Sequence, residues 1–125
     1  MKLLLDTCAL LWATGNEARL SDQARAEIGS DENVVYVSLV SLWELRIKES
    51  IGKITLPKNF YKKIEPVGFE ILPLLLHHIE AVGGLPLHHS DPFDRMLVAQ
   101  AKVEQLTLVT NDQEMIRYDV SFLRA

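Results

Sequence analysis

The sequence predicts an α/β fold with a mostly parallel central sheet. Short apolar or β-branched runs alternate along the chain with segments that carry helix start and stop signals. The first run, Leu3-Leu4-Leu5, has no polar alternation, which is typical of a strand buried on both faces of a parallel sheet. Strands that alternate with helices in this way favour the α/β class.

The first half of the chain is expected to contain two strands and three helices. Ser21 and Ser41 are plausible N-caps, and Gly29 and Gly52 are plausible helix stops. The β-branched run after residue 33 predicts the second strand. The predicted strands cover 2–5 and 34–37, and the predicted helices cover 7–13, 22–29 and 41–51.

The second half adds two more strands and a possible edge strand after Tyr118, which gives a sheet of four to five strands. Pro57 and Pro92 each fit the first turn of a helix, and Pro73 ends a short strand. The predicted helices cover 57–65, 74–82, 92–104 and 112–117, and the predicted strands cover 69–72 and 107–110.

The composition indicates a single domain over residues 1–125, with 48% hydrophobic residues. No apolar run approaches the ~20 residues that span a bilayer, and the N-terminus lacks the pattern of a signal peptide. We therefore expect no membrane association. Cys8 is the one cysteine, so no internal disulfide can form, and the expected location is the reducing cytoplasm.

Basic side chains are concentrated in one segment of a chain whose net charge is −4. The net charge argues mildly against a nonspecific nucleic-acid binder, but residues 46–63 contain only one acid, Glu49. This segment either meets a phosphate backbone or forms an ordinary solvated surface. Its basic residues are Arg46, Lys48, Lys53, Lys58, Lys62 and Lys63.

Four acids recur just beyond an apolar strand or loop, or on the helix that follows it: Asp6, Glu44, Asp94 and Asp112. Because ligands of open α/β sheets bind at the carboxyl ends of the strands, we expect these side chains to lie at one edge of the sheet. Mutual repulsion makes such a cluster costly unless a cation is bound.

Each of these acids also has a structural interpretation. Asp6 and Asp112 could cap the helices that follow them, and Ser41 with Glu44 matches a capping box. Glu44 nevertheless falls within the apolar face of its helix, where a carboxylate is costly unless it is paired or bound to metal.

The motif Asp91-Pro92-Phe93-Asp94-Arg95 contains two acids at one helix start. Asp91 directly precedes the proline and is expected to be the N-cap. Asp94 falls in the first turn, where the helix dipole favours an anion and keeps it ready for a cation.

Oxygen ligands favour Mg²⁺ or Mn²⁺ over zinc. A metal held by a few carboxylates suits phosphodiester hydrolysis. The histidines are less informative, because neighbours in sequence point in different directions, and His89 with Asp91 is a poor zinc fragment. Trp12 and Trp43 are expected in the core.

Four motifs resemble the PIN-domain ribonucleases, and in particular the VapC-type toxins of bacterial type II toxin–antitoxin systems. The resemblance covers nearly the whole chain, and the Asp-Pro-Phe-Asp-Arg block is its most specific part. The motifs are Leu3-Leu4-Leu5-Asp6-Thr7, Ser41-Leu42-Trp43-Glu44-Leu45, the block from Asp91 to Ala101, and Leu108-Val109-Thr110-Asn111-Asp112.

The resemblance implies a three-layer α/β/α sandwich and a Mg²⁺- or Mn²⁺-dependent endoribonuclease that leaves 5′-phosphate and 3′-hydroxyl ends. It further implies a homodimer and a cognate antitoxin that inhibits the enzyme. The catalytic and metal-binding acids of the family match Asp6, Glu44, Asp94 and Asp112, with Asp6 and Asp94 the principal metal ligands. Thr7 and Thr110 match small hydroxyl positions, whereas Cys8 departs from the usual Asn or His.

Two other function classes remain open from the residues alone. A phosphoryl-transfer domain could use Asp6 as a covalent nucleophile, although the second acid usual two residues later is replaced by Cys8. A noncatalytic binding module could keep the same fold. Trapping of a phosphoaspartate, or metal titration with RNA cleavage as readout, would separate these classes.

Overall fold

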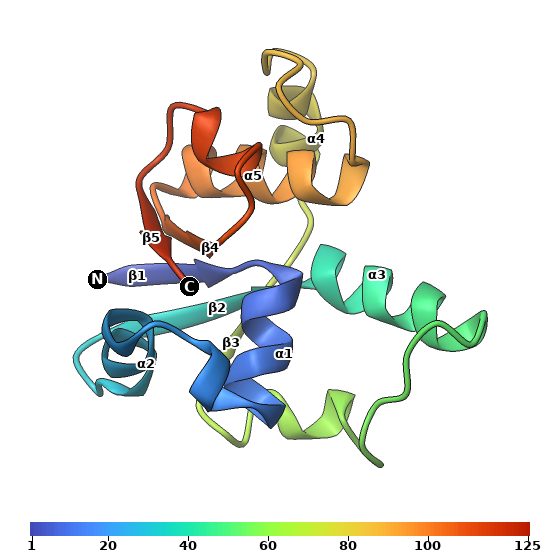
Figure 1. The fold of residues 1–125 in the computed structure, drawn as a ribbon. Helices are drawn as coiled ribbons and strands as arrows, with labels where there is room; N and C mark the ends of the chain where they lie inside the picture. Colours follow the sequence, from blue (N-terminus) through green and yellow to red (C-terminus); the bar gives the residue numbers. More distant parts are fainter.

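Five strands form one sheet, and five helices pack around it (Figure 1). The structure is a computed structural model that describes all of residues 1–125. The strands are β1 (Lys2–Leu5), β2 (Val34–Ser38), β3 (Glu70–Leu72), β4 (Thr107–Thr110) and β5 (Phe122–Arg124). The helices are α1 (Thr7–Gly15), α2 (Asp22–Gly29), α3 (Leu39–Ser50), α4 (Leu76–Val82) and α5 (Pro92–Glu104). None of these helices has both the length and the apolar character needed to cross a membrane.

β1 lies at the centre of an all-parallel sheet with the order β3-β2-β1-β4-β5. Leu4 of β1 pairs with Tyr36 of β2 on one side and with Leu108 of β4 on the other. The chain therefore extends the sheet first in one direction and then in the other, and the order reverses at β1. The crevice beyond the strand ends at such a reversal is where open α/β sheets bind ligands. The predicted parallel sheet is confirmed.

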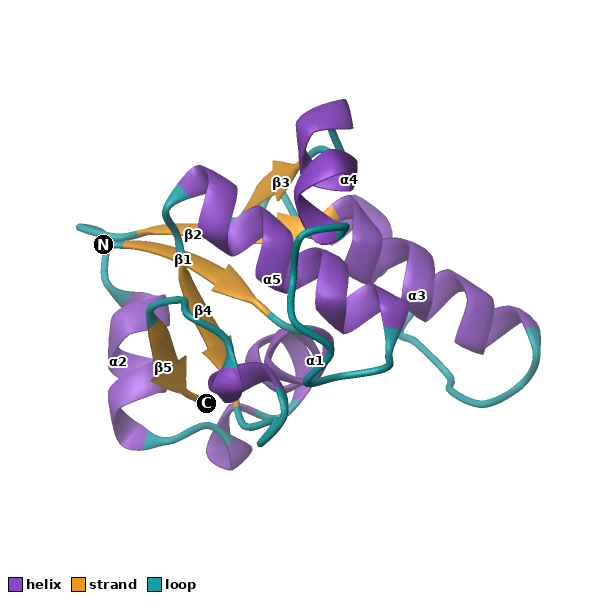
Figure 2. Cartoon of the chain, turned by 90° about the horizontal axis from the view of Figure 1, so that it is seen from above, coloured by secondary structure: helices purple, strands orange, loops and turns teal.

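The leucines of β1 alternate between two apolar clusters, which explains why the strand has no polar alternation. Leu3 and Leu5 pack with Leu10 of α1 and Ala24 of α2, whereas Leu4 packs with Leu97 of α5 on the opposite face. Figures 1 and 2 show α1 and α2 on one side of the sheet and α4 and α5 on the other. The expected three-layer sandwich is confirmed.

Polar side chains at the helix starts satisfy backbone groups that have no partner within the helix. Asp6 and Ser21 each accept the backbone N–H three residues later, at 2.7 and 3.0 Å. Asp91 accepts two N–H groups of the first turn of α5, at 2.8 and 3.1 Å. Ser21 and Asp91 are therefore the N-caps that the sequence predicts, and Asp6 caps α1 as its structural interpretation allows.

α3 begins at Leu39, two residues earlier than predicted. Ser38 is the cap: its hydroxyl accepts the N–H of Val40 and donates to the Oε1 atom of Gln100 at 2.6 Å. Ser41 is buried inside the helix, and its hydroxyl has no hydrogen-bond partner. The predicted capping box of Ser41 and Glu44 is therefore wrong, and the Glu44 carboxylate is available for other contacts.

The predicted helices over 57–65 and 112–117 are also wrong, because these segments contain only short 3₁₀ turns at Tyr61–Lys63 and Met115–Arg117. Asn59 adopts a left-handed conformation (φ 62°), which interrupts a helix that would start at Pro57. α4 begins at Leu76 rather than at residue 74. The expected edge strand after Tyr118 is confirmed as β5, which pairs parallel with β4.

Candidate metal centre

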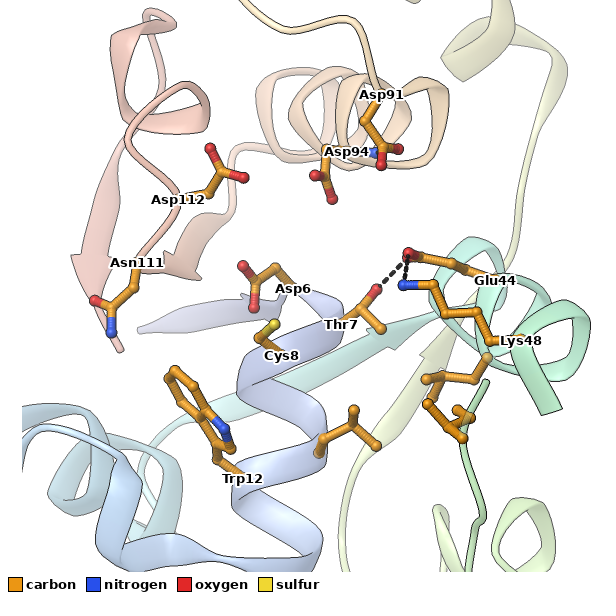
Figure 3. A pocket seen from close by; sticks show the side chains of 13 residues that line it. Asp6, Thr7, Cys8, Trp12, Glu44, Lys48, Asp91, Asp94, Asn111 and Asp112 are labelled. Atoms are coloured by element: carbon orange, nitrogen blue, oxygen red, sulfur yellow. Dashed lines mark hydrogen bonds and ion pairs between the residues drawn. The ribbon is translucent and has the colours of Figure 1, made fainter. Parts of the chain in front are cut away.

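The four predicted acids lie together in one pocket at the carboxyl edge of the sheet (Figure 3). The pocket has a volume of about 390 Å³ and lies between the start of α1, the middle of α3 and the start of α5. Apolar side chains, among them Leu11 and Trp12, form one part of its wall. Its polar lining consists of Asp6, Thr7, Cys8, Glu44, Lys48, Asp91, Asp94, Asn111 and Asp112.

Asp6 connects the end of β1 to the start of α1 and is only 6% exposed. Its Oδ1 atom accepts the N–H of Ala9, and its Oδ2 atom accepts the hydroxyl of Thr110 at 2.7 Å. Burial raises the pKa of Asp6 above its usual range, and these two hydrogen bonds oppose the rise. The carboxylate is thus held in one orientation by the first turn of α1 and the end of β4.

Glu44 reaches the pocket from α3 and is also 6% exposed. Its Oε1 atom accepts the hydroxyl of Thr7 at 2.6 Å, and its Oε2 atom pairs with the ammonium of Lys48 at 2.9 Å (Figure 3). Both oxygens therefore have a donor, as a buried carboxylate requires. The two contacts tie α3 to the first residue of α1.

Asp94 is the least compensated acid of the pocket. It lies in the first turn of α5, and no donor contacts its Oδ1 atom. Burial and the negative charges of Asp91 and Glu44 raise the pKa of Asp94 to about 7. A bound cation would favour the ionised form of Asp94. A positive charge added to the pocket would therefore be stabilised more beside Asp94 than beside the other predicted acids, whose oxygens already have donors.

Asp112 has the opposite electrostatic character. Burial acts against its charged form, but the backbone N–H groups of Glu114 and Met115 donate to Oδ1, and the ring of His89 donates to Oδ2. Together these hydrogen bonds lower the pKa of Asp112 below its usual range. The residue caps the turn after β4, where the sequence predicts a short helix, and it also lines the pocket.

His89 is the site residue that the sequence did not reveal. Its Nε2 atom lies 3.0 Å from Oδ2 of Asp94 and 3.1 Å from Oδ2 of Asp112. Because Nδ1 accepts the backbone N–H of Asp91 at 3.1 Å, the neutral ring carries its proton on Nε2 and donates toward both carboxylates. Burial opposes a charged ring, yet the carboxylates raise the pKa of His89 overall. No periodicity or spacing predicts this contact, since it depends on the path of the loop before α5.

Lys48 is the one member of the basic segment that lines the pocket. It stands one helical turn after Glu44 on α3, so the two side chains lie on one face of the helix. The ammonium of Lys48 supplies positive charge to the α3 side of the pocket. The remaining basic residues of the segment lie outside this pocket.

The residues of the pocket fit a divalent cation. Carboxylates from the ends of two strands and from two helices converge here, and each keeps lone pairs that no donor occupies. Oxygen ligands of this kind suit Mg²⁺ or Mn²⁺. Within this cluster, His89 and Lys48 provide the donors that offset the charge.

A second group of possible ligands, His77, His78 and Glu104, lies between α4 and α5. Its geometry does not suit a metal ion. The Nδ1 atom of buried His78 accepts the N–H of Leu75, so the neutral ring carries its proton on Nε2, the atom that faces Glu104 at 3.6 Å. A protonated nitrogen offers no lone pair, and the group is better described as a contact between two helices.

The raised pKa of Asp94 predicts that replacing this acid stabilises the metal-free protein. Ionising Asp94 in the folded state is costly, so the free energy of unfolding falls as the pH rises from the usual value of 3.8 through about 7. Asp94→Asn should raise Tm by about 2–6 °C near pH 8 and by much less near pH 5. Thermal melting at both pH values measures the difference.

The exposed Asp119 provides the control, because Asp119→Asn makes the same charge change outside the pocket and should leave Tm nearly unchanged at both pH values. Added Mg²⁺ should stabilise the wild type more than Asp94→Asn. An equal gain in Tm at the two pH values would contradict the assignment of the raised pKa to Asp94.

Comparisons with proteins of known structure agree with this architecture. The chain is similar to VapBC2 from Rickettsia felis, crystallised with a promoter DNA fragment (TM-score 0.74, 20% identity, 98% of each chain covered). It is similar to DNA-bound VapBC from Salmonella typhimurium (TM-score 0.70, 19% identity, 98% of this chain and 97% of that one). A toxin–antitoxin complex from Klebsiella pneumoniae is also similar (TM-score 0.63, 16% identity, 98% and 96%).

At these identities the likeness establishes the fold alone, and no curated protein matches the sequence. A comparison with protein families establishes more than the fold, because the sequence model of the PIN domain matches residues 3–121, almost the whole chain. The matched region contains Asp6, Glu44, Asp94 and Asp112, all of β2, β3 and β4, and β1 from its second residue onward. This chain is a member of the PIN domain family.

Proposed function

We propose that this protein is a metal-dependent endoribonuclease that acts as the toxin of a cytoplasmic toxin–antitoxin pair. PIN domains are generally nucleases, which supports a hydrolase. The observation that carries the proposal is the convergence of Asp6, Glu44, Asp94 and Asp112 in one pocket open to solvent. Hydrolysis of RNA phosphodiester bonds would leave 5′-phosphate and 3′-hydroxyl ends.

Asp6 and Asp94 are the proposed principal ligands of Mg²⁺, or of Mn²⁺ as a substitute, and Glu44 and Asp112 supplement them. When bound, such an ion lowers the pKa of a water molecule and offsets charge on the phosphate. The chain contributes the orientation: Thr110 and the α1 backbone fix Asp6, and Thr7 fixes Glu44. Asp94, whose pKa is raised to about 7, would be held in its ionised form by a cation at this position.

The rival in which Asp6 is a covalent nucleophile finds less support. Each oxygen of the Asp6 carboxylate accepts a hydrogen bond, and the side chain is almost fully buried. A carboxylate whose oxygens both accept hydrogen bonds is a poorer nucleophile, although each oxygen keeps a second lone pair that can bind a cation. Cys8 stands where a second acid would assist that reaction, and burial with the charges of Asp6 and Asp94 raises the pKa of its thiol.

An antitoxin partner is proposed from the relatives, since one similar structure is described as a toxin–antitoxin complex and two others contain VapBC.

A homodimer is proposed from an exposed apolar stripe on α3, formed by Leu39, Trp43 and Ile47 at four-residue spacing. Trp43 is 60% exposed, so its expected place in the core is wrong. Apolar stripes of this kind mark protein contacts.

Cleavage of a panel of defined single-stranded RNAs should require Mg²⁺ or Mn²⁺ and should stop in excess EDTA. Asp94→Asn should cleave at least ~100-fold more slowly, a loss of roughly 2.7 kcal/mol of transition-state stabilisation, because the amide keeps the shape but not the charge. Asp91→Asn is the control within the same motif, since Asn is also a good N-cap. Full activity in EDTA, or an inactive Asp91→Asn beside an active Asp94→Asn, would contradict the assignments.

Production of the protein alone should arrest bacterial growth, and co-production of its antitoxin should relieve the arrest. Asp6→Asn should abolish the arrest while keeping a folded chain, because Asn can still accept the N–H that caps α1. Growth curves and circular dichroism provide the two measurements. Equal toxicity of Asp6→Asn and the wild type would rule out the proposed role of Asp6.

Light scattering should give a mass of about twice the 14.2 kDa of one chain. Trp43→Glu places a charge in the middle of the α3 stripe and should produce a monomer. Leu87→Glu changes an exposed leucine outside the stripe and should leave the dimer intact. A monomeric wild type would refute the dimer without affecting the nuclease proposal.

A further inference from the structure

A second hollow, of about 320 Å³, lies between the end of α3 and the segment that follows it. We call it the cationic hollow, because Arg46, Lys58 and Lys62 line it together with a single acid, Glu49. Asn59 and Tyr61 add neutral polar groups. A local excess of positive charge is unusual in a chain whose net charge is −4.

The acid in the cationic hollow does not neutralise the lysines. Its Oε1 atom accepts from the guanidinium of Arg46 at 3.0 Å and from the hydroxyl of Tyr61 at 3.2 Å. Neither Lys58 nor Lys62 forms an ion pair in the structure, whose ion pairs are all at other residues. Two unpaired ammonium groups at one hollow attract an anion.

The cationic hollow and the acid pocket are both lined in part by α3 and the segment that follows it. Lys48 and Ile54 line the acid pocket, whereas Arg46 and Leu56, each two residues away, line the cationic hollow. Figure 1 shows that the chain after α3 turns back beneath that helix. α3 and the segment that follows it thus contribute side chains to both sites, Lys48 to the acid pocket and Arg46 to the cationic hollow.

We propose that the cationic hollow binds a phosphodiester group of the same single-stranded nucleic acid whose scissile phosphate lies in the acid pocket. The proposal rests on the proposed nuclease function and names Lys58 and Lys62 as its backbone-binding residues. The ammonium groups of these two flexible lysines would neutralise the charge of a backbone phosphate without contacting the bases. This contact also explains how an acidic protein with an acidic pocket holds a polyanion.

The test is the salt dependence of binding to an unstructured RNA of about 20 nucleotides, measured by fluorescence anisotropy in the Asp94→Asn background. In this background the RNA should stay uncut. Each phosphate contact to a single strand contributes a slope of about −0.7 in log K against log salt. Lys58→Gln with Lys62→Gln should therefore reduce the slope by about 1.4 and weaken binding roughly 10- to 30-fold near 0.1 M salt.

The matched control is Lys63→Gln with Lys102→Gln, which removes the same charge. Lys63 is the sequence neighbour of Lys62 but lines a different, largely apolar hollow with Phe60 and Ile64, and Lys102 is exposed on α5. The control should keep the wild-type slope. Equal slopes for the two double variants would overturn the proposal, and melting curves confirm that both are folded.

Cleavage kinetics in the otherwise wild-type chain give an independent reading. On the long RNA, the Lys58 and Lys62 double variant should raise KM with kcat unchanged, because uniform binding is lost. On a trinucleotide, which fills only the acid pocket, the double variant should match the wild type.

A wild type that cleaves no RNA would refute the nuclease function, while the salt slopes would still decide whether the cationic hollow binds nucleic acid. An acidic peptide serves as an alternative ligand. If the Lys58 and Lys62 double variant lost affinity for this peptide while its salt slope for RNA stayed at the wild-type value, the proposal would also be overturned.

Discussion

Repulsion among buried carboxylates is the constraint on which the arrangement of this site depends. Asp6 and Glu44 are almost inaccessible to water, so each of their oxygens needs a donor from the protein. Backbone N–H groups, threonine hydroxyls and the ammonium of Lys48 supply these donors. Asp94 is compensated least, and its raised pKa is the physical sign of a position that favours a cation.

The parallel sheet brings these groups together at a cost in stability. Its central strand ends at Asp6, and the neighbouring β4 supplies Thr110, whose hydroxyl donates to Asp6 and whose oxygen also accepts the N–H of Asp112. One threonine thus aligns two acids across adjacent strands. Burial of charge rarely stabilises a fold, so this network is better understood as orientation of ligands than as a source of stability.

Charge is distributed unevenly on α3 and the segment after it. Glu44 and Lys48 face the acid pocket, whereas Arg46 and Glu49 face the cationic hollow. The helix therefore separates a mainly acidic pocket from a mainly basic one. This separation underlies the proposal that a protein of net charge −4 meets an anionic polymer through this helix and the segment after it.

The sequence by itself determined the elements whose burial is local and periodic. The leucine run predicted a central strand because both faces of β1 are covered, and Asp91-Pro92 predicted the start of α5 because the cap and the fixed φ angle act within one turn. The four acids could be grouped because parallel strands present their carboxyl ends at one edge. Tertiary structure alone decided that Ser38 rather than Ser41 caps α3, that His89 lies between Asp94 and Asp112, and that Lys62 and Lys63 line different hollows. These features depend on loop paths set by contacts between residues distant in sequence, which no local pattern records.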